Sequence, residues 1–498
     1  MFSTQVVSKF AKSAADFSDR NAFLIHDVFY TYTEFWDRIS IIRAGIHETI
    51  KNSNIVGVVA HDHIDTYASI FALWLEGMAY VPLHPKQPME RNLEIVAQAE
   101  IQKVLDANLD SDYSSQLVVK TQAFNIDNKR TELLDFPEDL LAYILFTSGS
   151  TGKPKGVQIS RHNVGSFMHA FMQAGFIVDE TDRCLQCFDL TFDVSVQSFL
   201  LPLTHGACVY TIPHDQIKYS YVYGLLEDHE LTFGVFAPSM IRFLRPYFDE
   251  IDLPKMRYCI LTAEASPVDL VQEWGRCIPN ATIFNFYGPT EATIYCTYYP
   301  VPKNNAIKQG NGMLCIGKPF AGIKAVILDE SFNSVGSGVK GEMYIAGDQL
   351  TSGYWKNPEK NSESFTTLTF DGETARYYKT GDLCFEDSEG DIMYFGRLDY
   401  QVKIQGYRIE LGEIEFNARE IIGGKNAVAF TFEGNAGNLE IAICLEIDAL
   451  DKETFLSALK GKLPSYMIPS RVYNLVEFPL NTSGKIDRNV IKQQVQAL

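Results

Sequence analysis

The stretch Leu145-Phe-Thr-Ser-Gly-Ser-Thr-Gly-Lys-Pro-Lys-Gly-Val157 combines glycines, hydroxyl side chains and two lysines, and it continues from an apolar run, Leu140–Leu145. The apolar run is short enough for a buried strand. Glycines let backbone N–H groups approach an anion closely, hydroxyls add donors, and Lys153 and Lys155 supply positive charge. The segment therefore predicts a loop that holds phosphate.

This loop differs from the phosphate loop of P-loop nucleotide-binding proteins. That motif requires a glycine five positions before its Gly-Lys pair, and a Ser or Thr after the lysine. Here Thr147 stands at the first position and Pro154 follows Lys153. Taken alone, the stretch also fits an ordinary flexible loop, so motifs elsewhere in the chain must decide between the two interpretations.

Composition limits the class of protein. The chain has 498 residues, 46% apolar and 21% charged, which is ordinary for soluble globular proteins of two or more domains. Its net charge of −19 argues against nucleic acid or an anionic membrane as the main partner. No apolar run approaches the roughly 18 residues that would span a bilayer. We expect Met1–Ala15 to form an amphipathic helix, not a signal peptide, and the protein to be cytoplasmic.

Cysteines and histidines form no strong metal-ligand pattern in the sequence. Cys184 and Cys187 make one C-x-x-C pair, but no second pair accompanies it, and zinc sites usually have four ligands. The triplet His61-Asp62-His63 is interpreted as a loop, not as a ligand set.

Strands and helices alternate over much of the chain, which is typical of parallel sheets covered by helices. Phe29–Trp36 is interpreted as a hairpin strand that Thr33 caps into a helix, and Tyr67–Glu76 as a helix with one apolar face. The predicted buried strands are Ile55–Ala60, Ala79–Pro85 with its turn, Ala207–Ile212, Phe233–Ala237 and Tyr258–Thr262.

The later part of the chain has a different pattern of residues. Between residues 312 and 398, Gly-rich segments with period-two patterning predict an antiparallel, barrel-like part, as in Glu342–Ala346 and Asp391–Phe395. The last hundred residues have strands of their own, Ala427–Phe432 and Leu439–Ile447. The predicted fold class is α/β, with a large N-terminal domain of helix-covered sheets (residues 1–398) and a small mobile α+β C-terminal domain (residues 399–498).

Further motifs follow the loop in a fixed order. They are Phe192-Asp-Val-Ser195, Asn285-Phe-Tyr-Gly-Pro-Thr-Glu291, Gly341–Gly347 with Gly353-Tyr354, Tyr378-Lys-Thr-Gly-Asp382, Gly396–Glu410 and Asn481–Arg488. Together with the loop, they resemble the adenylate-forming superfamily over nearly the whole chain. This superfamily contains acyl-CoA synthetases, luciferases and the amino-acid adenylation domains of nonribosomal peptide synthetases, and the resemblance is strongest to the amino-acid adenylation enzymes.

The resemblance implies an enzyme that joins a carboxylate to the α-phosphorus of ATP with loss of pyrophosphate. Catalysis of that step is mainly positioning and electrostatics. It implies that Lys485 is the catalytic lysine, that Glu291 holds Mg²⁺ and that Thr290 bonds the α-phosphate. Asp382 is expected to accept both ribose hydroxyls, assisted by Arg397. The other ATP-binding residues implied are Thr147, Ser148, Gly149, Ser150, Thr151, Gly152, Lys153, Asn285, Phe286, Tyr287 and Gly288.

Two of these residues have more specific expected roles, since Tyr287 would stack on adenine and Asn285 would meet its exocyclic amine. Asp399 matches the family's hinge residue. The family uses one domain orientation for adenylation and another for thiol attack, in which Gly406 would line the tunnel for a phosphopantetheine arm.

Each of these residues also has a structural explanation when taken alone. Asp382 after Thr-Gly could be a turn residue or a helix cap, and Arg397 could be a surface charge. Lys485 could be a solvated turn lysine, and Glu291 could stabilise the start of a helix at Pro289. The ordered set of motifs favours the catalytic and binding roles.

Asp193 carries the prediction about the substrate. An aspartate at this position in amino-acid adenylation enzymes pairs with the α-ammonium of the substrate, and a buried carboxylate without a cation is costly. The alternative is a structural Asp that caps the following Val194–Phe199 segment. The resemblance places ten residues in the pocket: Asp193, Val194, Gln197, Val235, Leu261, Ala263, Phe286, Ile294, Tyr295 and Lys485.

Apart from Asp193 and Lys485, none of these pocket residues is charged, so acidic and basic amino acids are disfavoured. Phe286 and Tyr295 reduce the volume. The first three pocket residues, Asp193, Val194 and Gln197, resemble those of proline-activating pockets, although Phe286 departs from the polar residue often found there. The pocket therefore favours proline or another small neutral amino acid.

The motifs leave three further interpretations. The chain ends soon after Lys485, and no condensation or carrier domain is recognised in it, so we expect a free-standing enzyme that loads a separate phosphopantetheinylated carrier protein. That architecture also fits D-alanine–D-alanyl carrier protein ligases, although those usually have a cysteine where this chain has Thr262-Ala-Glu264. An acyl- or aryl-CoA ligase is disfavoured by Asp193. A catalytically inactive nucleotide-binding scaffold is disfavoured by the presence of Lys485, Glu291 and Asp382.

Overall fold

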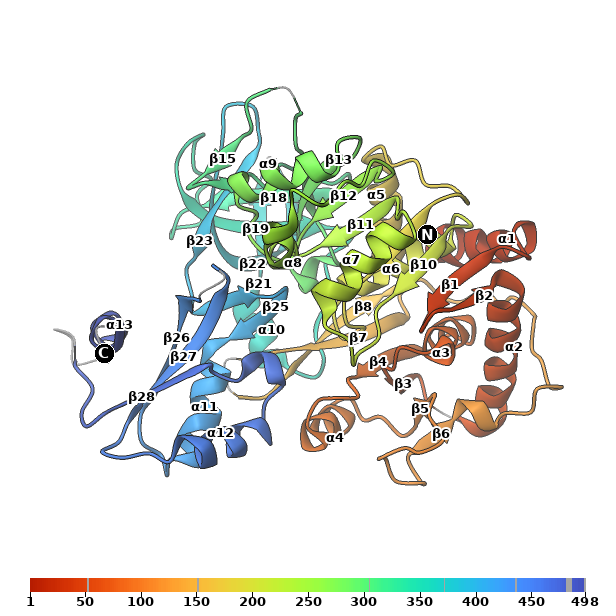
Figure 1. The fold of residues 1–498 in the computed structure, drawn as a ribbon, viewed down its shortest axis with the longest axis horizontal. Coiled ribbons are helices and arrows are strands. Elements are labelled where there is room, and N and C mark those ends of the chain that lie inside the picture. The colour runs from red at the N-terminus through yellow and green to blue at the C-terminus, as the bar shows by residue number, and fades with distance from the viewer. Residues whose placement is uncertain are drawn as a thin grey trace. The chain divides into compact units, whose positions relative to one another are not determined.

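The chain folds into two units (Figure 1). The computed structural model describes residues 1–51, 53–149, 152–303, 305–370, 372–434, 437–480 and 486–496, with only the backbone of residue 496. Unit 1 consists of Met1–Pro85, Val96–Phe146 and Gly156–Leu398, and unit 2 of Lys86–Ile95, Thr147–Lys155 and Asp399–Leu498. The predicted phosphate loop thus groups with unit 2.

A seven-stranded sheet lies in the first part of the chain, with strand order β20-β8-β7-β4-β3-β5-β6. The strand pairs from β7 to β6 are parallel, and β20 is antiparallel to β8. Strand β4 is buried along its whole length, as a sheet covered on both faces requires. The bounds are β3 Ile55–Val59, β4 Ala79–Leu83, β5 Val104–Asp106, β6 Val118–Lys120, β7 Leu141–Thr147, β8 Lys155–Ser160 and β20 Gly353–Tyr354.

A nine-stranded sheet has the order β17-β14-β13-β12-β11-β9-β10-β1-β2. The strands from β13 to β1 are parallel, and β2, β14 and β17 pair in the antiparallel sense. The bounds are β1 Asn21–Ile25, β2 Val28–Thr31, β9 Arg183–Gln186, β10 Cys208–Thr211, β11 Phe233–Phe236, β12 Tyr258–Leu261, β13 Thr282–Tyr287, β14 Thr297–Pro300 and β17 Lys318–Pro319. The predicted strands β3, β4, β10, β11 and β12 are confirmed.

The Gly-rich part forms an antiparallel sheet of five strands, in which β18-β19-β22-β21 are neighbours and β23 also pairs with β22. The predicted change from parallel to antiparallel pairing is therefore confirmed. The bounds are β18 Ile323–Leu328, β19 Gly341–Gly347, β21 Phe365–Phe370, β22 Glu373–Glu386 and β23 Ile392–Arg397, and a separate short pair is β15 Gln309–Gly310 with β16 Met313–Leu314.

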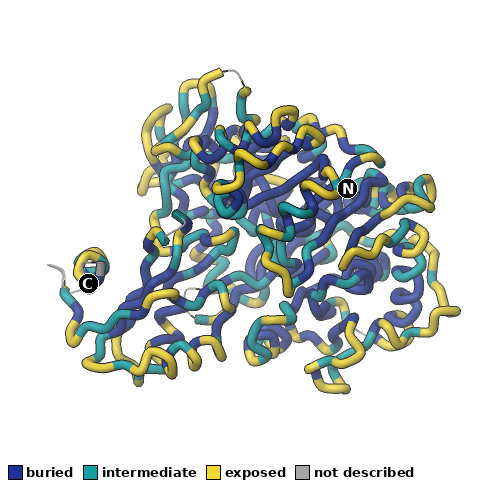
Figure 2. The backbone as a smooth tube through the Cα atoms, in the orientation of Figure 1, coloured by how far each residue is buried: buried dark blue, intermediate teal, exposed yellow. Residues whose placement is uncertain are grey.

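Helices accompany the two mainly parallel sheets. All twelve residues of α3 are buried, so this helix belongs to the core and does not have the single apolar face predicted for it. Figure 2 shows burial concentrated along the strands and such helices. The bounds are α1 Ser8–Asp16, α2 Tyr32–Thr49, α3 Ile64–Leu75, α5 Arg161–Gln173, α6 Val194–Leu203, α7 Lys218–Asp228, α8 Pro238–Leu244, α9 Val268–Cys277 and α10 Pro358–Ser364, and α4 Met89–Gln98 spans the division between the units.

The start of α2 corrects one prediction. Its N-cap is Thr31, not Thr33: the Thr31 side chain accepts the Glu34 N–H, and the Glu34 carboxylate accepts the Thr31 N–H at 2.7 Å. This is a capping box, which satisfies two backbone donors at once. Thr33 instead donates its hydroxyl to the Ser18 carbonyl. At the N-terminus, a turn of π-helix over Ser3–Val7 and α1 confirm the expected amphipathic helix.

The C-terminal residues of unit 2 form a three-stranded sheet, β26-β27-β28, and a hairpin, β24-β25. Helix α11 packs on β26, with Ile414 and Ala418 in the same apolar cluster as Ala427 and Ala429. The bounds are β24 Gln401–Ile404, β25 Tyr407–Glu410, α11 Leu411–Ile421, β26 Ala427–Glu433, β27 Leu439–Glu446, α12 Lys452–Lys460, β28 Arg471–Leu475 and α13 Arg488–Gln496. Among the helices described in either unit, none is long and apolar enough to cross a bilayer.

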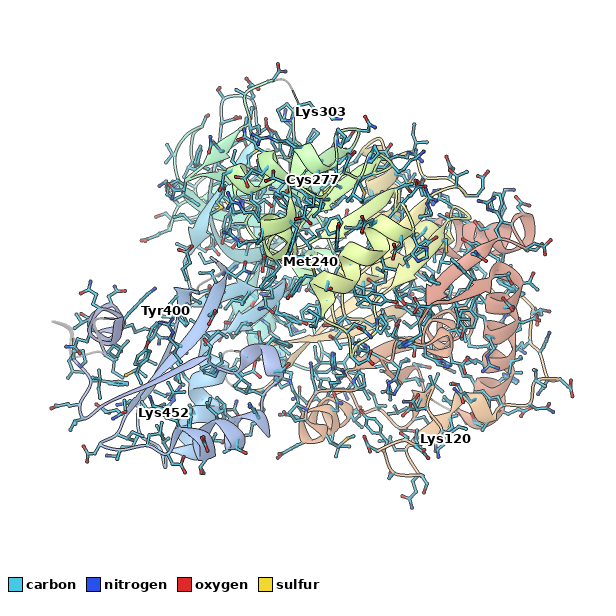
Figure 3. All side chains as sticks on the ribbon, viewed as in Figure 1. Lys120, Met240, Cys277, Lys303, Tyr400 and Lys452 are labelled. Carbon is cyan, nitrogen blue, oxygen red and sulfur yellow. The ribbon has the colours of Figure 1, made fainter. Side chains whose placement is uncertain are left out.

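Arg488, the first residue of α13, contacts both α11 and β26 of unit 2. Its guanidinium pairs with the buried Glu415 carboxylate on α11 and donates to the Ala429 carbonyl on β26 at 3.0 Å. The Ala429 N–H returns a bond of 2.8 Å to Glu415. The guanidinium also lies 4.3 Å from the ring centre of Tyr400, which Figure 3 labels. Arg488 is the last residue of the predicted lysine motif, Asn481–Arg488, and these contacts fix the start of α13.

Replacing Arg488 by Ala should destabilise unit 2 by about 3 kcal/mol, because a buried carboxylate would lose its cation. Native-state hydrogen exchange of the β26 and β27 amides measures this loss. Lys462→Ala is the matched control, since its ion pair with Glu420 is exposed on both sides and should contribute at most about 1 kcal/mol. Equal protection in the two variants would contradict the expected role of Arg488.

Candidate active site

The Asp382 carboxylate is the centre of the polar cluster in unit 1. It lies on β22, is buried, and accepts a hydrogen bond from the Tyr287 hydroxyl and one of 2.7 Å from Arg397 on β23. Its own N–H donates to Thr380 Oγ1 at 3.0 Å. Three predicted nucleotide residues, Asp382, Tyr287 and Arg397, are therefore in direct contact. Because an ionised carboxylate has about four lone-pair sites, Asp382 retains capacity for further donors.

The predicted nucleotide-binding residues on strand β13 lie on opposite faces of the sheet. Successive side chains of a strand point to opposite faces, so Asn285 and Tyr287 share one face and Phe286 lies on the other. The Asn285 amide donates to the Cys315 carbonyl and accepts from the Ser266 hydroxyl, both at 2.8 Å. Asn285 is thus already anchored by two neighbours.

On the opposite face, Phe286 packs in an aromatic cluster. Its ring centre lies 5.0 Å from that of Tyr295 and 5.6 Å from that of Phe320. The sequence predicts Phe286 for both the nucleotide site and the acyl pocket, and in the structure it contacts Tyr295, another predicted acyl-pocket residue.

The turn after β13 requires a glycine at position 288. A Cβ there would stand 2.4 Å from the Ile294 carbonyl oxygen and 2.6 Å from the Tyr295 Cα. Glu291 follows in a short 3₁₀ turn, Thr290–Ala292, and is fully buried. Its carboxylate accepts the Tyr354 hydroxyl at 2.7 Å. The turn therefore holds a buried carboxylate next to a backbone that admits no side chain.

The backbone beyond Glu291 is strained. Thr293 and Ile294 have φ values of 55° and 73°, which β-branched residues adopt rarely and at a cost of about 1–3 kcal/mol each. Gln349 stabilises this conformation, because its amide donates to the Tyr295 carbonyl at 2.6 Å and its backbone carbonyl accepts the Thr293 hydroxyl at 2.6 Å. The strained residues follow the predicted metal residue, Glu291, and one of them, Ile294, is itself a predicted pocket residue.

Asp193 is buried at the N-terminal end of α6. It occupies the N-cap position, but its side chain makes no capping hydrogen bond to the helix. Burial raises the pKa of three tyrosines, Tyr80, Tyr143 and Tyr295, and the charge of Asp193 raises each further. The carboxylate therefore lies near buried phenols and does not act as a helix cap.

Tyr80 on β4 and Tyr143 on β7 lie near Asp193 and are absent from the site residues that the sequence predicts. Their ring centres lie 5.7 Å apart, and both hydroxyls are buried without a hydrogen-bond partner among the residues that the structure describes. In the sequence they are indistinguishable from core residues of buried strands. Only the lack of partners for their hydroxyls, which buried polar groups normally find, distinguishes them.

The other predicted pocket residues are buried or lie at the carboxyl ends of strands. Gln197 on α6 accepts the Tyr295 hydroxyl at 3.5 Å, and its amide nitrogen has no partner among the described residues. Ala263, directly after β12, has a φ of 69°. The remaining members, Val194, Val235 and Leu261, are buried apolar residues on α6, β11 and β12.

Unit 2 contains the described part of the predicted phosphate loop. The Gly149 N–H donates to the Glu413 carboxylate at 3.2 Å, and the Ser148 hydroxyl donates to the Arg408 carbonyl at 2.9 Å. Lys155 lies 3.7 Å from the Glu410 carboxylate. Burial raises the pKa of Glu413, and its pairing with Arg91 opposes that shift. Donors of the loop are thus engaged by carboxylates and carbonyls of the same unit.

Lys153 of this loop is exposed, whereas Lys155 is buried. Gly152 lies next to Phe416, whose ring would be 2.3 Å from a Cβ at that position. Thr147 closes the loop by donating to the Lys155 carbonyl at 3.5 Å. Three predicted site residues, Ser150, Thr151 and Lys485, lie outside the described residues.

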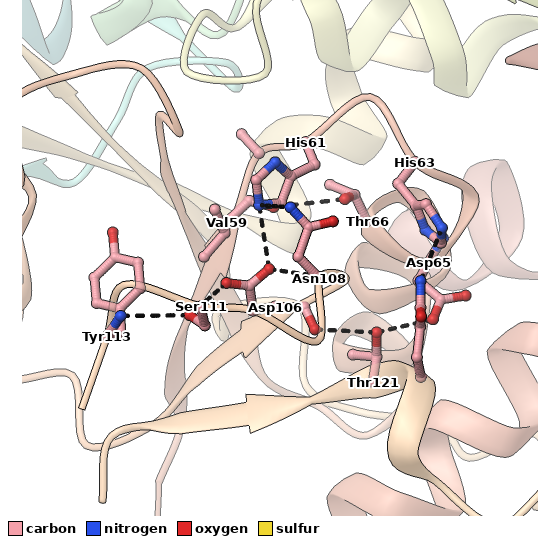
Figure 4. A network of polar contacts seen from close by, with 12 residues as sticks. Val59, His61, His63, Asp65, Thr66, Asp106, Asn108, Ser111, Tyr113 and Thr121 are labelled. Atoms are coloured by element: carbon pink, nitrogen blue, oxygen red, sulfur yellow. Dashed lines mark hydrogen bonds and ion pairs between the residues drawn. The ribbon is translucent and has the colours of Figure 1, made fainter. Parts of the chain in front are cut away.

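The interpretation of His61-Asp62-His63 as a loop is confirmed (Figure 4). His63 accepts the Asp65 N–H at 3.0 Å and so caps α3, whereas His61 pairs with Asp106 at 3.2 Å. Cys184 and Cys187 are buried, and burial raises the pKa of both thiols, as expected of structural cysteines.

Comparison with known proteins gives three findings. The AMP-binding enzyme family model matches residues 10–355. A linear gramicidin synthase of Brevibacillus parabrevis is 33% identical over 481 residues, which cover 93% of this chain and 9% of that protein. Tyrocidine synthase 1 of the same organism is 31% identical over 97% of this chain and 44% of its own length. The chain thus spans less than half of these curated relatives.

Solved structures share the fold. The Vibrio cholerae adenylation domain AlmE in complex with glycyl-adenosine-5'-phosphate has a TM-score of 0.85 at 24% identity, covering 99% of this chain and 98% of that one. An NRPS protein containing adenylation and PCP domains, bound to a vinylsulfonamide inhibitor, also has a TM-score of 0.85 at 22% identity, covering 98% and 84%. The predicted α/β architecture is therefore confirmed.

Replacement of Tyr by Phe should have different effects on stability at Tyr80 and at Tyr354. Tyr80→Phe removes a buried hydroxyl without a partner and should leave the free energy of unfolding unchanged or raise it by up to about 1 kcal/mol. Tyr354→Phe removes the donor to a buried carboxylate, Glu291, and should lower it by about 1–3 kcal/mol. Urea denaturation of both variants tests this difference, and destabilisation by Tyr80→Phe alone would contradict it.

Proposed function

Because the chain belongs to the AMP-binding enzyme family of adenylate-forming enzymes, we propose that it activates a small neutral amino acid with ATP. The substrate carboxylate attacks the α-phosphorus, the bond to the bridging oxygen of the β-phosphate breaks, and pyrophosphate leaves as aminoacyl-AMP forms. The observation that carries the choice of an amino acid is the buried Asp193 carboxylate near the phenols of Tyr80, Tyr143 and Tyr295.

A substrate ammonium supplies a cation that this environment favours. A carboxylate buried in a pocket of low polarity is stabilised by an opposite charge within hydrogen-bond reach. The Tyr80 and Tyr143 hydroxyls, unpartnered among the described residues, offer further polar contacts to a ligand there. The side chain of Asp193 makes no capping bond to α6, which removes the main structural explanation for an acid at this position.

The other pocket residues support a neutral side chain of limited size. Val194, Val235 and Leu261 are apolar, and the rings of Phe286 and Tyr295 pack against one another. A charged substrate side chain would remain unpaired among them. Proline and glycine-sized amino acids fit this description, and the similarly folded AlmE was solved in complex with glycyl-adenosine-5'-phosphate.

The nucleotide roles follow from the cluster around Asp382. We assign the ribose to Asp382 with Arg397, the adenine to the Asn285 and Tyr287 face of β13, and the phosphates to Thr290 and the loop from Thr147 to Lys153. The Glu291 carboxylate suits Mg²⁺, since this ion prefers oxygen ligands, and the bound ion would neutralise charge on the phosphoryl oxygens. Lys485 would supply the second cation.

We further propose a second step, in which a phosphopantetheine thiol of a carrier protein attacks the aminoacyl carbonyl and AMP leaves. The support is similarity to peptide synthases and to a structure that contains adenylation and PCP domains. Residues 399–498 would then move as a lid about Asp399 between the two steps. The use of ATP fits a cytoplasmic enzyme.

An ATP–pyrophosphate exchange assay across amino acids tests the first step. We expect one small neutral amino acid to drive exchange well above the background without amino acid. Lys485→Ala should abolish exchange while ATP still binds, because the lysine acts on the developing charge. Exchange driven only by acids without an amine would favour an acyl- or aryl-CoA ligase, and no exchange with any acid would contradict adenylation.

Asp193→Ala should lower kcat/KM for the preferred amino acid by at least about 100-fold, since the loss of a buried ion pair is worth about 3 kcal/mol or more. The same acid without its amino group should be activated equally by the variant and the parent. Comparison of the two substrates in the exchange assay measures this. An equal loss for both substrates would show that Asp193 has a structural role.

A further inference from the structure

Three side chains outside the proposed nucleotide and acyl pockets meet in unit 1. They are His84, Asp189 and His214, and each offers one ligand atom within 4.8 Å of the other two. His84 Nε2 lies 4.0 Å from Asp189 Oδ1, and His214 Nδ1 lies 3.9 Å from the same oxygen. All three side chains are largely buried, with 15%, 15% and 22% of their surface exposed.

The three residues come from separate places in the fold. His84 follows β4 of the seven-stranded sheet, whereas Asp189 follows β9 and His214 follows β10 of the nine-stranded sheet. Strands β9 and β10 are parallel neighbours, so both residues lie at the same edge of that sheet. The three ligand atoms therefore converge from two different sheets, which sequence spacing alone could not have indicated.

The chemistry of this set matches a transition metal more closely than magnesium or calcium. Two imidazoles and one carboxylate are common ligands of zinc, and three protein ligands leave a fourth position open. At metal–ligand distances of about 2.0–2.2 Å, tetrahedral ligand atoms are about 3.4 Å apart. The observed separations of 3.9 and 4.0 Å exceed that value by about half an ångström, which small side-chain rotations can close.

We propose that His84, Asp189 and His214 form a binding site for Zn²⁺ or a similar late first-row divalent cation. The ion binds through neutral imidazole nitrogens and the ionised carboxylate, so its binding displaces protons from any protonated histidine. It joins the two sheets at the segment between β9 and α6, which carries Asp193 at its end. The proposal does not depend on the identity of the substrate.

Two neighbours of His214 bear on the proposed site: the buried Asp62 carboxyl group and the Ala60 carbonyl. Asp62 is buried near His214; burial raises its pKa to about 6, and the charges of His26 and His214 oppose that shift. The other nitrogen of His214, Nε2, lies 2.9 Å from the Ala60 carbonyl. A carbonyl partner on the outer nitrogen fixes the tautomer and leaves Nδ1 for a metal.

The test is a Co²⁺ titration of the tag-free, chelator-treated full chain without nucleotide. We expect one equivalent of Co²⁺ to bind with visible d–d bands, Zn²⁺ to displace it and Mg²⁺ not to. His214→Ala and Asp189→Asn should each weaken binding by more than about 100-fold, since loss of even an outer partner of a ligand costs about 10–100-fold. Zn²⁺ should also raise the thermal midpoint of the parent and not of these variants.

His61→Ala is the matched control, because His61 pairs with Asp106 outside the proposed site (Figure 4). This variant should bind Co²⁺ as the parent does. Asp189→Asn preserves shape and provides the test if His214→Ala does not fold. Absence of stoichiometric Co²⁺ binding by the parent overturns the proposal, as does unchanged binding by Asp189→Asn.

Discussion

The structure depends on several buried carboxylates, whose negative charge must be balanced by cations or hydrogen-bond donors within the protein. Asp382 is held by the Tyr287 hydroxyl and the Arg397 guanidinium, and Glu291 by the Tyr354 hydroxyl. In unit 2, Glu415 has Arg488 and the Ala429 N–H. Because an uncompensated buried charge costs several kcal/mol, these partners fix the relative positions of strands that are distant in sequence. The same acids are the residues to which the family resemblance assigns binding roles, apart from Glu415.

Some of the strained backbone lies in the segments that carry predicted site residues. Thr293, Ile294 and Ala263 have positive φ values, and all three lie just beyond the carboxyl ends of β12 and β13. Gln349 holds the first two in place through bonds to carbonyls and a hydroxyl. Strain of this kind persists only where neighbouring structure over-determines it. The bonds from Gln349 are the neighbouring contacts that hold Thr293 and Ile294 in this conformation.

The sequence predicted the parts of the fold that local patterns determine. A run of β-branched residues predicted β3, a short apolar run predicted β11, and glycines with period-two patterning predicted the antiparallel sheet, because these patterns reflect burial of a strand's own side chains. The helix cap was misplaced by two residues, since Thr31 and Thr33 are chemically equivalent and only the position of Glu34 identifies the capping box. The Asp193, Asp382 and Glu291 positions came from ordered motifs, and not from periodicity.

What could not be predicted were contacts between distant segments. Tyr80 and Tyr143 have the burial pattern of ordinary core residues, so their unpartnered hydroxyls near Asp193 could not be foreseen. His84 lies far from Asp189 and His214 in the sequence, and the three converge only through sheet topology. Pairwise geometry of this type depends on the register of whole sheets, which a single sequence does not reveal.

The predicted phosphate loop contacts two acidic residues of unit 2, Glu413 and Glu410, and these contacts bear on how a ligand would bind there. The Glu413 carboxylate accepts the Gly149 N–H, and Glu410 lies near Lys155, so a phosphate bound as proposed would compete with carboxylates of the chain. The apparent dissociation constant of such a ligand is its intrinsic value divided by the fraction of molecules in which the loop is open. Under the proposed phosphate role of the loop, Glu413 would return to the Gly149 N–H when an anionic product leaves, so the chain itself would satisfy that donor between ligands.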